Sequence, residues 1–428
     1  LYLGPVPWLA LVFAMVISGS LGMGATAWLG THIPKSWGRY GTLLVYPLGA
    51  AALWVLREAV ASRFPYGGFS WGRFSFAHSD SPFSHLLAWV ASAGLAFIAV
   101  AILVLFLQLL LQKQLAAWLK PLPVLTLVLL PLWPQWAPQI IGEVRIAAVQ
   151  GDADASLNST NPRGTILKNH YDATMAIINE KFDLLVWPEN ASDLDPLRNE
   201  LAAATLDYLS ETLNVPIVVG TITKSGDELF NSALLWESGK GAVDQYDKVH
   251  PVPFAEYMPN REFFMMLAPD LVSLVTRDYS FGERDPIFDI HDFHAGIAIC
   301  YDIADDEAMR QMIFEGAQII LAPTNNADFG ETDQNQQQLA IARVRGLESA
   351  RSVVNISTVG TSAIIAPDGT LIDELVRYEP GAMIANVPLA EGVTPAVAMQ
   401  WYFEAALAVL LALLFSVVIV ISAQKKRA

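Results

Sequence analysis

Cys300 is the single cysteine in the 428 residues of this chain, and it lies where an apolar segment ends. Residues 295–299 read as a buried strand, and Tyr301 and Asp302 stop the apolar run. A lone thiol in this position is either a small packed side chain or a nucleophile. A nucleophile needs a base and an anion-stabilising group nearby, because a thiol with an ordinary pKa of ~8.5 is mostly protonated at neutral pH.

Two charged residues lie at the ends of other predicted strands. Glu189 ends the segment "LLVWPE", and Lys248 follows "GAVDQYD". Because ligands of open α/β sheets gather at the carboxyl ends of strands, we expect the carboxylate, the ammonium group and the thiol to meet in one pocket. There Glu189 takes the thiol proton, while Lys248 and the backbone N–H of Tyr301 hold an oxyanion. A helix-capping glutamate and a solvated lysine are the alternatives.

The segments around these motifs predict an α/β domain over residues 143–392. Apolar strands alternate with helices, which is typical of a sheet covered on its faces. The strands are expected at 144–150, 183–189, 215–222, 295–302, 317–323 and 352–358, with helices before 180, at 197–213, after 302 to 316 and at 334–350.

Long apolar runs flank this domain. Each is close to or above the ~20 residues that cross a hydrocarbon core of ~30 Å, which predicts a multi-pass membrane protein. Residues 1–137 are expected to hold about four membrane helices, and 396–421 a fifth, followed by a basic tail at 422–428. The four N-terminal runs are 7–29, 40–60, 85–111 and 117–133.

The charge of the chain differs between these regions. Residues 143–392 hold 16 Lys and Arg against 39 Asp and Glu, which argues against a nucleic-acid partner. Lys425, Lys426 and Arg427 follow the last apolar run and predict a cytoplasmic end. The α/β domain is then expected on the extracytoplasmic face of the cytoplasmic membrane. The same count places Leu1 outside, which predicts an odd number of helices ahead of it.

Together the motifs around Glu189, Lys248 and Cys300 resemble the Glu–Lys–Cys triad of the nitrilase superfamily. With helices on both sides, the domain is similar to that of the bacterial apolipoprotein N-acyltransferases. The resemblance implies a four-layer αββα sandwich with the triad at one end. It also implies supporting or substrate-binding roles for Glu256 and Asn231, and for Tyr301 beside the nucleophile.

The same resemblance implies the reaction. Cys300 takes an acyl chain from a phospholipid as a thioester and passes it to the amine of diacylglyceryl-cysteine on an apolipoprotein, with no metal or other cofactor and as a monomer. The sequence departs from the family pattern at Asp302, where glutamate is common. It departs again at "TNNADFG", residues 324–330, where Asn-Asp-Ala-Trp-Phe is usual.

An apolar segment after Lys248 suggests how a lipid reaches the thiol. Phe263, Phe264, Met265 and Met266 are consecutive on an otherwise acidic domain, and such a patch is costly in water. One interpretation is an arm that dips into the outer leaflet and admits acyl chains. The other is a short amphipathic helix packed on the domain.

Two further functions stay open at this stage. The first is a membrane-tethered amidase or nitrilase acting on small amides, although a small polar substrate does not require a membrane anchor. The second is a non-catalytic scaffold that binds lipoproteins, although the complete set of Glu189, Lys248 and Cys300 favours an enzyme.

Overall fold

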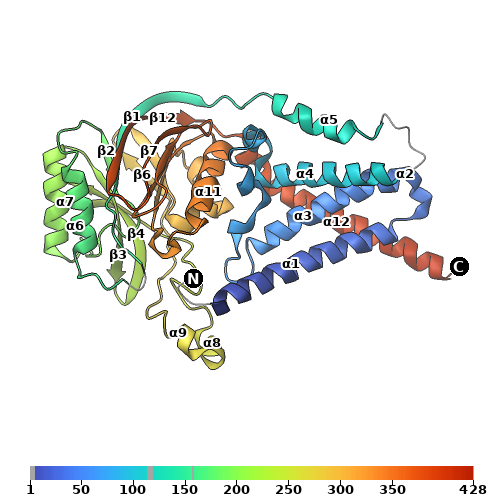
Figure 1. The fold of residues 1–428 in the computed structure, drawn as a ribbon, viewed down its shortest axis with the longest axis horizontal. Coiled ribbons are helices and arrows are strands. Elements are labelled where there is room, and N and C mark those ends of the chain that lie inside the picture. The colour runs from blue at the N-terminus through green and yellow to red at the C-terminus, as the bar shows by residue number, and fades with distance from the viewer. Residues whose placement is uncertain (1–4, 113–118, 157–158, 428) are drawn as a thin grey trace. The chain divides into compact units, whose positions relative to one another are not determined.

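The computed structural model describes residues 5–112, 119–156 and 159–427 (Figure 1). The chain divides into two compact units. One comprises the chain up to Trp136 together with the chain from Thr394, and the other is Ala137–Val393. The second unit contains the whole predicted α/β domain.

The first unit is helical. By length and composition, four helices of the described chain can cross a membrane, at Val12–His32, Lys35–Ala61, Ser84–Leu111 and Pro395–Gln424. They correspond to α1 (Pro5–His32), α2 with α3 (Gly38–Tyr40 and Tyr46–Ala61), α4 (Leu87–Leu111) and α12 (Pro395–Arg427). Small side chains such as Ala52, Ala93 and Ala96 lie where α3, α4 and α12 pack together, which lets apolar helices approach closely.

The fourth predicted apolar run differs from the others. Only α5 (Leu122–Leu129) and a 3₁₀ turn (Leu130–Leu132) form there, and the first residues of the run, 117 and 118, lie outside the described residues. Pro121, Pro123 and Pro131 punctuate this segment, and proline within a helix removes a hydrogen bond and ends the regular structure. The helix is shorter than a membrane crossing requires.

The second unit contains two six-stranded sheets. The first has the order β12-β1-β2-β3-β4-β5 and the second β11-β10-β9-β8-β7-β6. In each sheet the middle strands are parallel, β1-β2-β3 in one and β7-β8-β9 in the other, and the outer pairs are antiparallel. The strands are β1 (Gln139–Gln150), β2 (Leu184–Val186), β3 (Ile217–Ser225), β4 (Glu228–Glu237), β5 (Gly241–Asp247), β6 (Ile287–Ile290), β7 (Phe293–Ile297), β8 (Ile319–Thr324), β9 (Ser352–Ser357), β10 (Ala363–Ile365), β11 (Leu371–Glu374) and β12 (Gly381–Glu391).

The two sheets pack face to face between two layers of helices. Val186 and Val218 of the first sheet share one buried core with Ile297 and Leu321 of the second. The outer face of the first sheet packs against α6 (Thr165–Met175) and α7 (Glu200–Leu213), and α10 (Asp306–Phe314) and α11 (Gln334–Ser349) cover the second (Figure 1). The predicted combination of apolar helices with an αββα sandwich is confirmed, but the described residues contain four helices long enough to cross a membrane, not the five expected.

Several predicted elements are shorter in the structure. The helix expected between the segment "AGIAICYD" and Gly316 begins only at Asp306, as α10, where the Asp305 carboxylate accepts hydrogen bonds from the backbone N–H groups of Glu307 and Ala308. The helix expected to reach residue 180 ends as α6 at Met175. Cys300, expected at the end of the strand segment, instead opens a 3₁₀ turn, Cys300–Ala304.

Candidate active site

Cys300 lies just beyond the carboxyl end of β7. The backbone N–H of Ala298 still bonds to the carbonyl of Leu321 on β8, at 3.0 Å, and the chain then turns into the 3₁₀ segment. Cys300 has φ 51°, a left-handed conformation that residues other than glycine adopt infrequently. The sharp turn takes the half-buried side chain out of the strand direction, at the edge where the parallel strands of both sheets end.

Glu189 follows β2 after a short turn and is 4% exposed. Gly220 on the neighbouring strand β3 makes this position possible. A Cβ on Gly220 would lie 2.3 Å from the carbonyl oxygen of Pro188 and 2.6 Å from the Cα of Glu189. Only glycine therefore lets the Glu189 turn lie flat against β3.

Lys248 is the first residue after β5 and is 1% exposed. Its backbone N–H donates to the carbonyl of Asn231 on β4, at 2.8 Å, and its carbonyl accepts from the N–H of Gly282, at 2.9 Å. A Cβ on Gly282 would lie 1.9 Å from the carbonyl oxygen of Asp247, so the returning chain approaches this closely only because it has glycine there.

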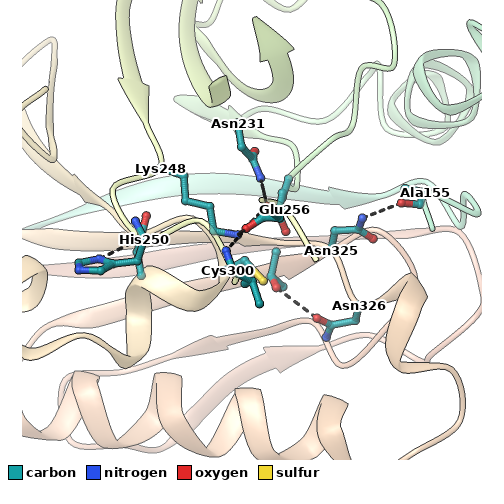
Figure 2. Close-up of polar contacts among 12 residues, drawn as sticks. Ala155, Asn231, Lys248, His250, Glu256, Cys300, Asn325 and Asn326 are labelled. Atoms are coloured by element: carbon teal, nitrogen blue, oxygen red, sulfur yellow. Dashed lines mark hydrogen bonds and ion pairs between the residues drawn. The ribbon is translucent and has the colours of Figure 1, made fainter. Parts of the chain in front are cut away.

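Two carboxylates hold the Lys248 ammonium group, and Figure 2 labels one of them, Glu256. Lys248 Nζ lies 3.2 Å from Glu189 Oε1 and 2.9 Å from Glu256 Oε2. Asn231 Nδ2 donates to Glu189 Oε1 at 2.7 Å and to Glu256 Oε1 at 2.9 Å, which links the two carboxylates. The other oxygen of Glu256 accepts from the backbone N–H of Val252, at 2.6 Å, so the loop after Lys248 is tied to the same group.

The charges of this cluster determine how its members titrate. Burial raises the pKa of Glu189, and the charge of Glu256 adds to this, against the opposing effect of Lys248. Burial disfavours the Lys248 ammonium group, but Glu189 and Glu256 outweigh it and raise its pKa well above the usual value. Lys248 is therefore a permanent cation, and Glu189 is more basic than an ordinary carboxylate.

Cys300 is protonated in the resting state. Burial raises the pKa of its thiol to about 12, the charge of Glu189 acts in the same direction, and Lys248 acts against both. Figure 2 shows Cys300, Lys248 and Glu256 converging. A thiol with this pKa needs a base at the moment of attack, and Glu189 has the raised basicity that such a base requires.

The structure thus brings together Glu189, Lys248, Glu256 and Asn231, with Cys300 close enough to respond to their charge. Tyr301 is half-buried in the 3₁₀ turn directly after Cys300.

The predicted lipid arm forms two short helices, α8 (Arg261–Leu267) and α9 (Pro269–Val272). Its apolar residues lie in two different environments. Phe264 turns inward and packs edge-on against Phe254, with ring centroids 5.0 Å apart, whereas Phe263, Met265 and Met266 are exposed.

The sequence analysis missed two groups beside the triad. One joins the loop of Lys248 to the turn of Cys300: the fully buried carboxylate of Asp302 accepts from Tyr246 Oη at 2.9 Å and from the backbone N–H of His250 at 3.0 Å. The other is Gln338 on α11, whose Nε2 lies 3.7 Å from Cys300 Sγ. The position of Asp302, two residues after the cysteine, is a signal that the sequence offers. Gln338 has no such signal, because it is one of three consecutive glutamines and nothing in the sequence distinguishes it from the other two.

Two family models match most of this chain between them. Residues 145–393 match the carbon-nitrogen hydrolase family, and residues 1–105 match the apolipoprotein N-acyltransferase N-terminal domain. A crystal structure of an amidase from Nesterenkonia sp. is 20% identical, with a TM-score of 0.43, and the match covers 58% of this chain and 92% of that one.

Two curated relatives match along most of the chain. The apolipoprotein N-acyltransferase of Mycolicibacterium smegmatis is 31% identical over 432 residues, which covers 92% of this chain and 70% of the relative. That of Shewanella oneidensis is 27% identical over 380 residues, which covers 82% and 69%. The helical unit and the αββα unit are therefore matched together in single proteins, and the chain belongs to the apolipoprotein N-acyltransferase family, within the nitrilase superfamily.

Proposed function

We propose that the protein moves an acyl chain from a phospholipid, through a thioester on Cys300, to the N-terminal amine of a diacylglyceryl-cysteine. Its family makes it an acyltransferase that N-acylates apolipoproteins, and its four apolar helices make it an inner-membrane protein. The observation that carries the proposed chemistry is the buried Lys248, held between two carboxylates beside Cys300.

In the first half-reaction Cys300 Sγ attacks the ester carbonyl of the phospholipid. Glu189 takes the thiol proton as the S–C bond forms, and the carbonyl oxygen becomes an oxyanion. The Lys248 ammonium group and the backbone N–H of Tyr301 stabilise this oxyanion. When the C–O bond breaks, Glu189 returns the proton to the departing oxygen, and a lysophospholipid leaves.

The second half-reaction uses the same groups. The amine of diacylglyceryl-cysteine attacks the thioester carbonyl, and Glu189 takes a proton from the amine nitrogen. Collapse of the second oxyanion forms the amide bond and releases the Cys300 thiolate, which recovers its proton from Glu189.

Glu256 and Asn231 make Glu189 suitable for this shuttle. With both carboxylates ionised, the three charges of Glu189, Glu256 and Lys248 sum to −1, so adding a proton to Glu189 leaves the cluster neutral. Glu256 keeps Lys248 charged and in place while Glu189 is protonated, because its carboxylate stays on the ammonium group, 2.9 Å away. Asn231 holds Glu189 at a fixed position through its amide, at 2.7 Å.

We also propose that the arm formed by α8 and α9 admits the acyl chain from the outer leaflet. Phe263, Met265 and Met266 supply an exposed apolar face, while the partly buried contact between Phe264 and Phe254 secures the arm to the domain. The salt bridge from Arg261 to Asp278, at 2.6 Å, anchors its base. An exposed apolar face on an anchored support suits insertion into lipid.

The remaining assignments concern topology and assembly. The basic residues Lys425, Lys426 and Arg427 at the end of α12 favour a multi-pass arrangement with the catalytic domain on the extracytoplasmic face. All the catalytic groups named belong to one chain, so we propose that the monomer is active.

The test of this function is intact-protein mass spectrometry of the detergent-solubilised protein after incubation with phospholipid. We expect a mass increase of one acyl chain, absent from Cys300→Ala and removed when a diacylglyceryl-cysteine peptide is added. The peptide should gain the same acyl chain on its amine. Hydrolysis of small amides without any acyl adduct from phospholipid would instead identify an amidase.

A further inference from the structure

We propose that Gln338 is a further catalytic residue, which donates an amide hydrogen bond to Cys300 Sγ when the thiolate forms. Gln338 lies on α11, in the helical layer over the second sheet, and is 1% exposed. Its Nε2 atom lies 3.7 Å from Cys300 Sγ, within hydrogen-bond reach of sulfur. The inference rests on the proposed role of Cys300 as the nucleophile.

A chain of hydrogen bonds orients the amide of Gln338. Its Nε2 also donates to Thr324 Oγ1, at 2.5 Å, and the Thr324 hydroxyl in turn donates to Asn326 Oδ1, at 3.1 Å. In this contact Thr324 Oγ1 is the acceptor and the Gln338 amide is the donor. The amide therefore presents its NH₂ group to both the hydroxyl and the sulfur, one hydrogen to each.

Gln338 completes the environment that a thiolate needs. Cys300 receives the charge of Lys248 from the side of the first sheet, where β5 ends, and the amide of Gln338 from the helix over the second sheet. Because Cys300 is partly buried, the thiolate keeps only part of the water that would otherwise solvate it. A fixed donor replaces part of that solvation at no cost of reorganisation.

The contact favours the reacting state over the resting one. A neutral thiol or a thioester sulfur is a weak acceptor, whereas a thiolate is a strong one, so the hydrogen bond strengthens as the proton moves to Glu189. Such a differential interaction accelerates a reaction rather than merely binding its substrate. It acts twice, when Cys300 attacks the phospholipid ester and when the thiolate leaves the thioester.

The critical variant is Gln338→Met, which keeps the length and approximate volume of the side chain but has no N–H group. Gln336 lies two residues earlier on α11 and is exposed, so Gln336→Met is the matched control. Two rates are measured on the full-length protein in detergent: acyl-enzyme formation from phospholipid, and alkylation of Cys300 by iodoacetamide between pH 7 and pH 10. The second rate requires neither substrate nor transfer.

We expect Gln338→Met to slow acyl-enzyme formation about tenfold, as the loss of a hydrogen bond to a charged group does. Alkylation should slow about threefold across the pH range, because a less stabilised thiolate is scarcer but more nucleophilic. Gln338→Glu should be slower still in both assays, since it adds a negative charge beside the sulfur. Gln336→Met should match the unchanged protein.

The inference is overturned if Gln338→Met matches the unchanged protein in both rates, or if Gln338→Glu alkylates faster. If Gln338→Met lowers the thermal unfolding temperature markedly, Thr324→Val provides the second test, because it removes the hydroxyl that orients the amide. Thr324→Val should slow both rates in the same direction, and unchanged rates would also refute the inference. Failure of the unchanged protein to form an acyl adduct would refute the proposed function instead.

Discussion

At the scale of single residues, the site combines a base, a permanent cation and a protonated thiol. Glu189 and Lys248 act on each other and on Cys300, but in opposite directions: burial and Glu189 raise the pKa of the thiol, whereas Lys248 lowers it. Because the two residues shift the pKa of the thiol in opposite directions, their substitution should have opposite effects on the amount of thiolate. The effect of each substitution on acyl transfer can therefore be compared with its effect on the thiolate.

Substitution of the triad should stop the reaction at different stages. Cys300→Ala removes the atom that carries the acyl chain, so acyl-enzyme and product should both be absent. Glu189→Gln should fail to form the acyl-enzyme for lack of a base, and Lys248→Met should slow both half-reactions by ~10²–10³, as the loss of an oxyanion contact does. Single-turnover mass spectrometry measures each step; normal acylation by Lys248→Met contradicts its assigned role.

Alkylation of Cys300 should respond differently to the same substitutions. Glu189→Gln removes a negative charge that raises the pKa of the thiol, so the thiolate becomes more abundant and iodoacetamide should react several-fold faster at pH 8. Lys248→Met removes the opposing positive charge and should slow the same reaction. A variant such as Glu189→Gln that alkylates faster yet transfers no acyl chain would show that thiolate alone is insufficient.

At the scale of elements, the layers of the sandwich place groups that are distant in sequence on one site. β2 and β5 of the first sheet end near Glu189 and Lys248, while β7 of the second ends near Cys300, so the nucleophile and its charged partners come from facing sheets. The connection after β5 carries the lipid arm. The turn after β7 carries Asp302, which accepts hydrogen bonds from Tyr246 and His250 and so links the two sheets. Helices α8 and α6 each allow a prediction.

The exposed face of α8 is expected to control lipid access. Changing Phe263, Met265 and Met266 together to serine, with Phe264 kept, should sharply lower acylation of Cys300 from phospholipid vesicles, because the apolar approach is lost. Reaction with a small water-soluble activated ester should persist. The control Phe264→Ser disturbs the partly buried contact with Phe254 and should lower the unfolding temperature instead. If both reactions fall equally in the triple variant, lipid enters elsewhere.

Helix α6 should make the catalytic domain sensitive to acid. His170 is fully buried, and burial lowers its pKa from 6.5 to about 4. The unfolded chain binds this proton more readily, so stability is complete above about pH 6.5 and falls as the pH drops toward 4. His170→Gln should reduce the loss of stability between pH 7 and pH 4.5 by about 2–3 kcal/mol. Thermal unfolding at both pH values measures this, and an equal loss in both proteins contradicts it.

At the scale of the whole molecule, an acidic catalytic domain is joined to helices that are long and apolar enough to cross a membrane. Residues 143–392 carry 39 acidic and 16 basic residues, and the chain from Pro395 enters α12. A membrane-impermeant amine reagent applied to intact spheroplasts should label lysines of the catalytic domain, such as the exposed Lys168 and Lys240. Labelling only after lysis would place the domain in the cytoplasm.

The sequence by itself predicted the α/β class, four of the apolar helices, and the positions of Glu189, Lys248 and Cys300 at strand ends. These depend on local patterns: a long apolar run has few alternatives to a membrane helix, and a charged residue directly after an apolar strand reaches the sheet edge in any α/β arrangement. Glu256, Asn231 and Tyr301 followed from the family pattern rather than from local signals.

Only the tertiary structure decided which side chains touch. Nothing local distinguishes Gln338 from Gln336 and Gln337, and its contact with Cys300 depends on the rotation of α11 against the second sheet. Likewise the direction of Phe264 depends on Phe254, ten residues earlier, and the Asp302 link depends on β5 of the opposite sheet. These contacts join segments that are far apart in the sequence. The hydrophobic periodicity of one segment predicts which of its faces is buried, but not which side chains of another segment it meets after the layers pack.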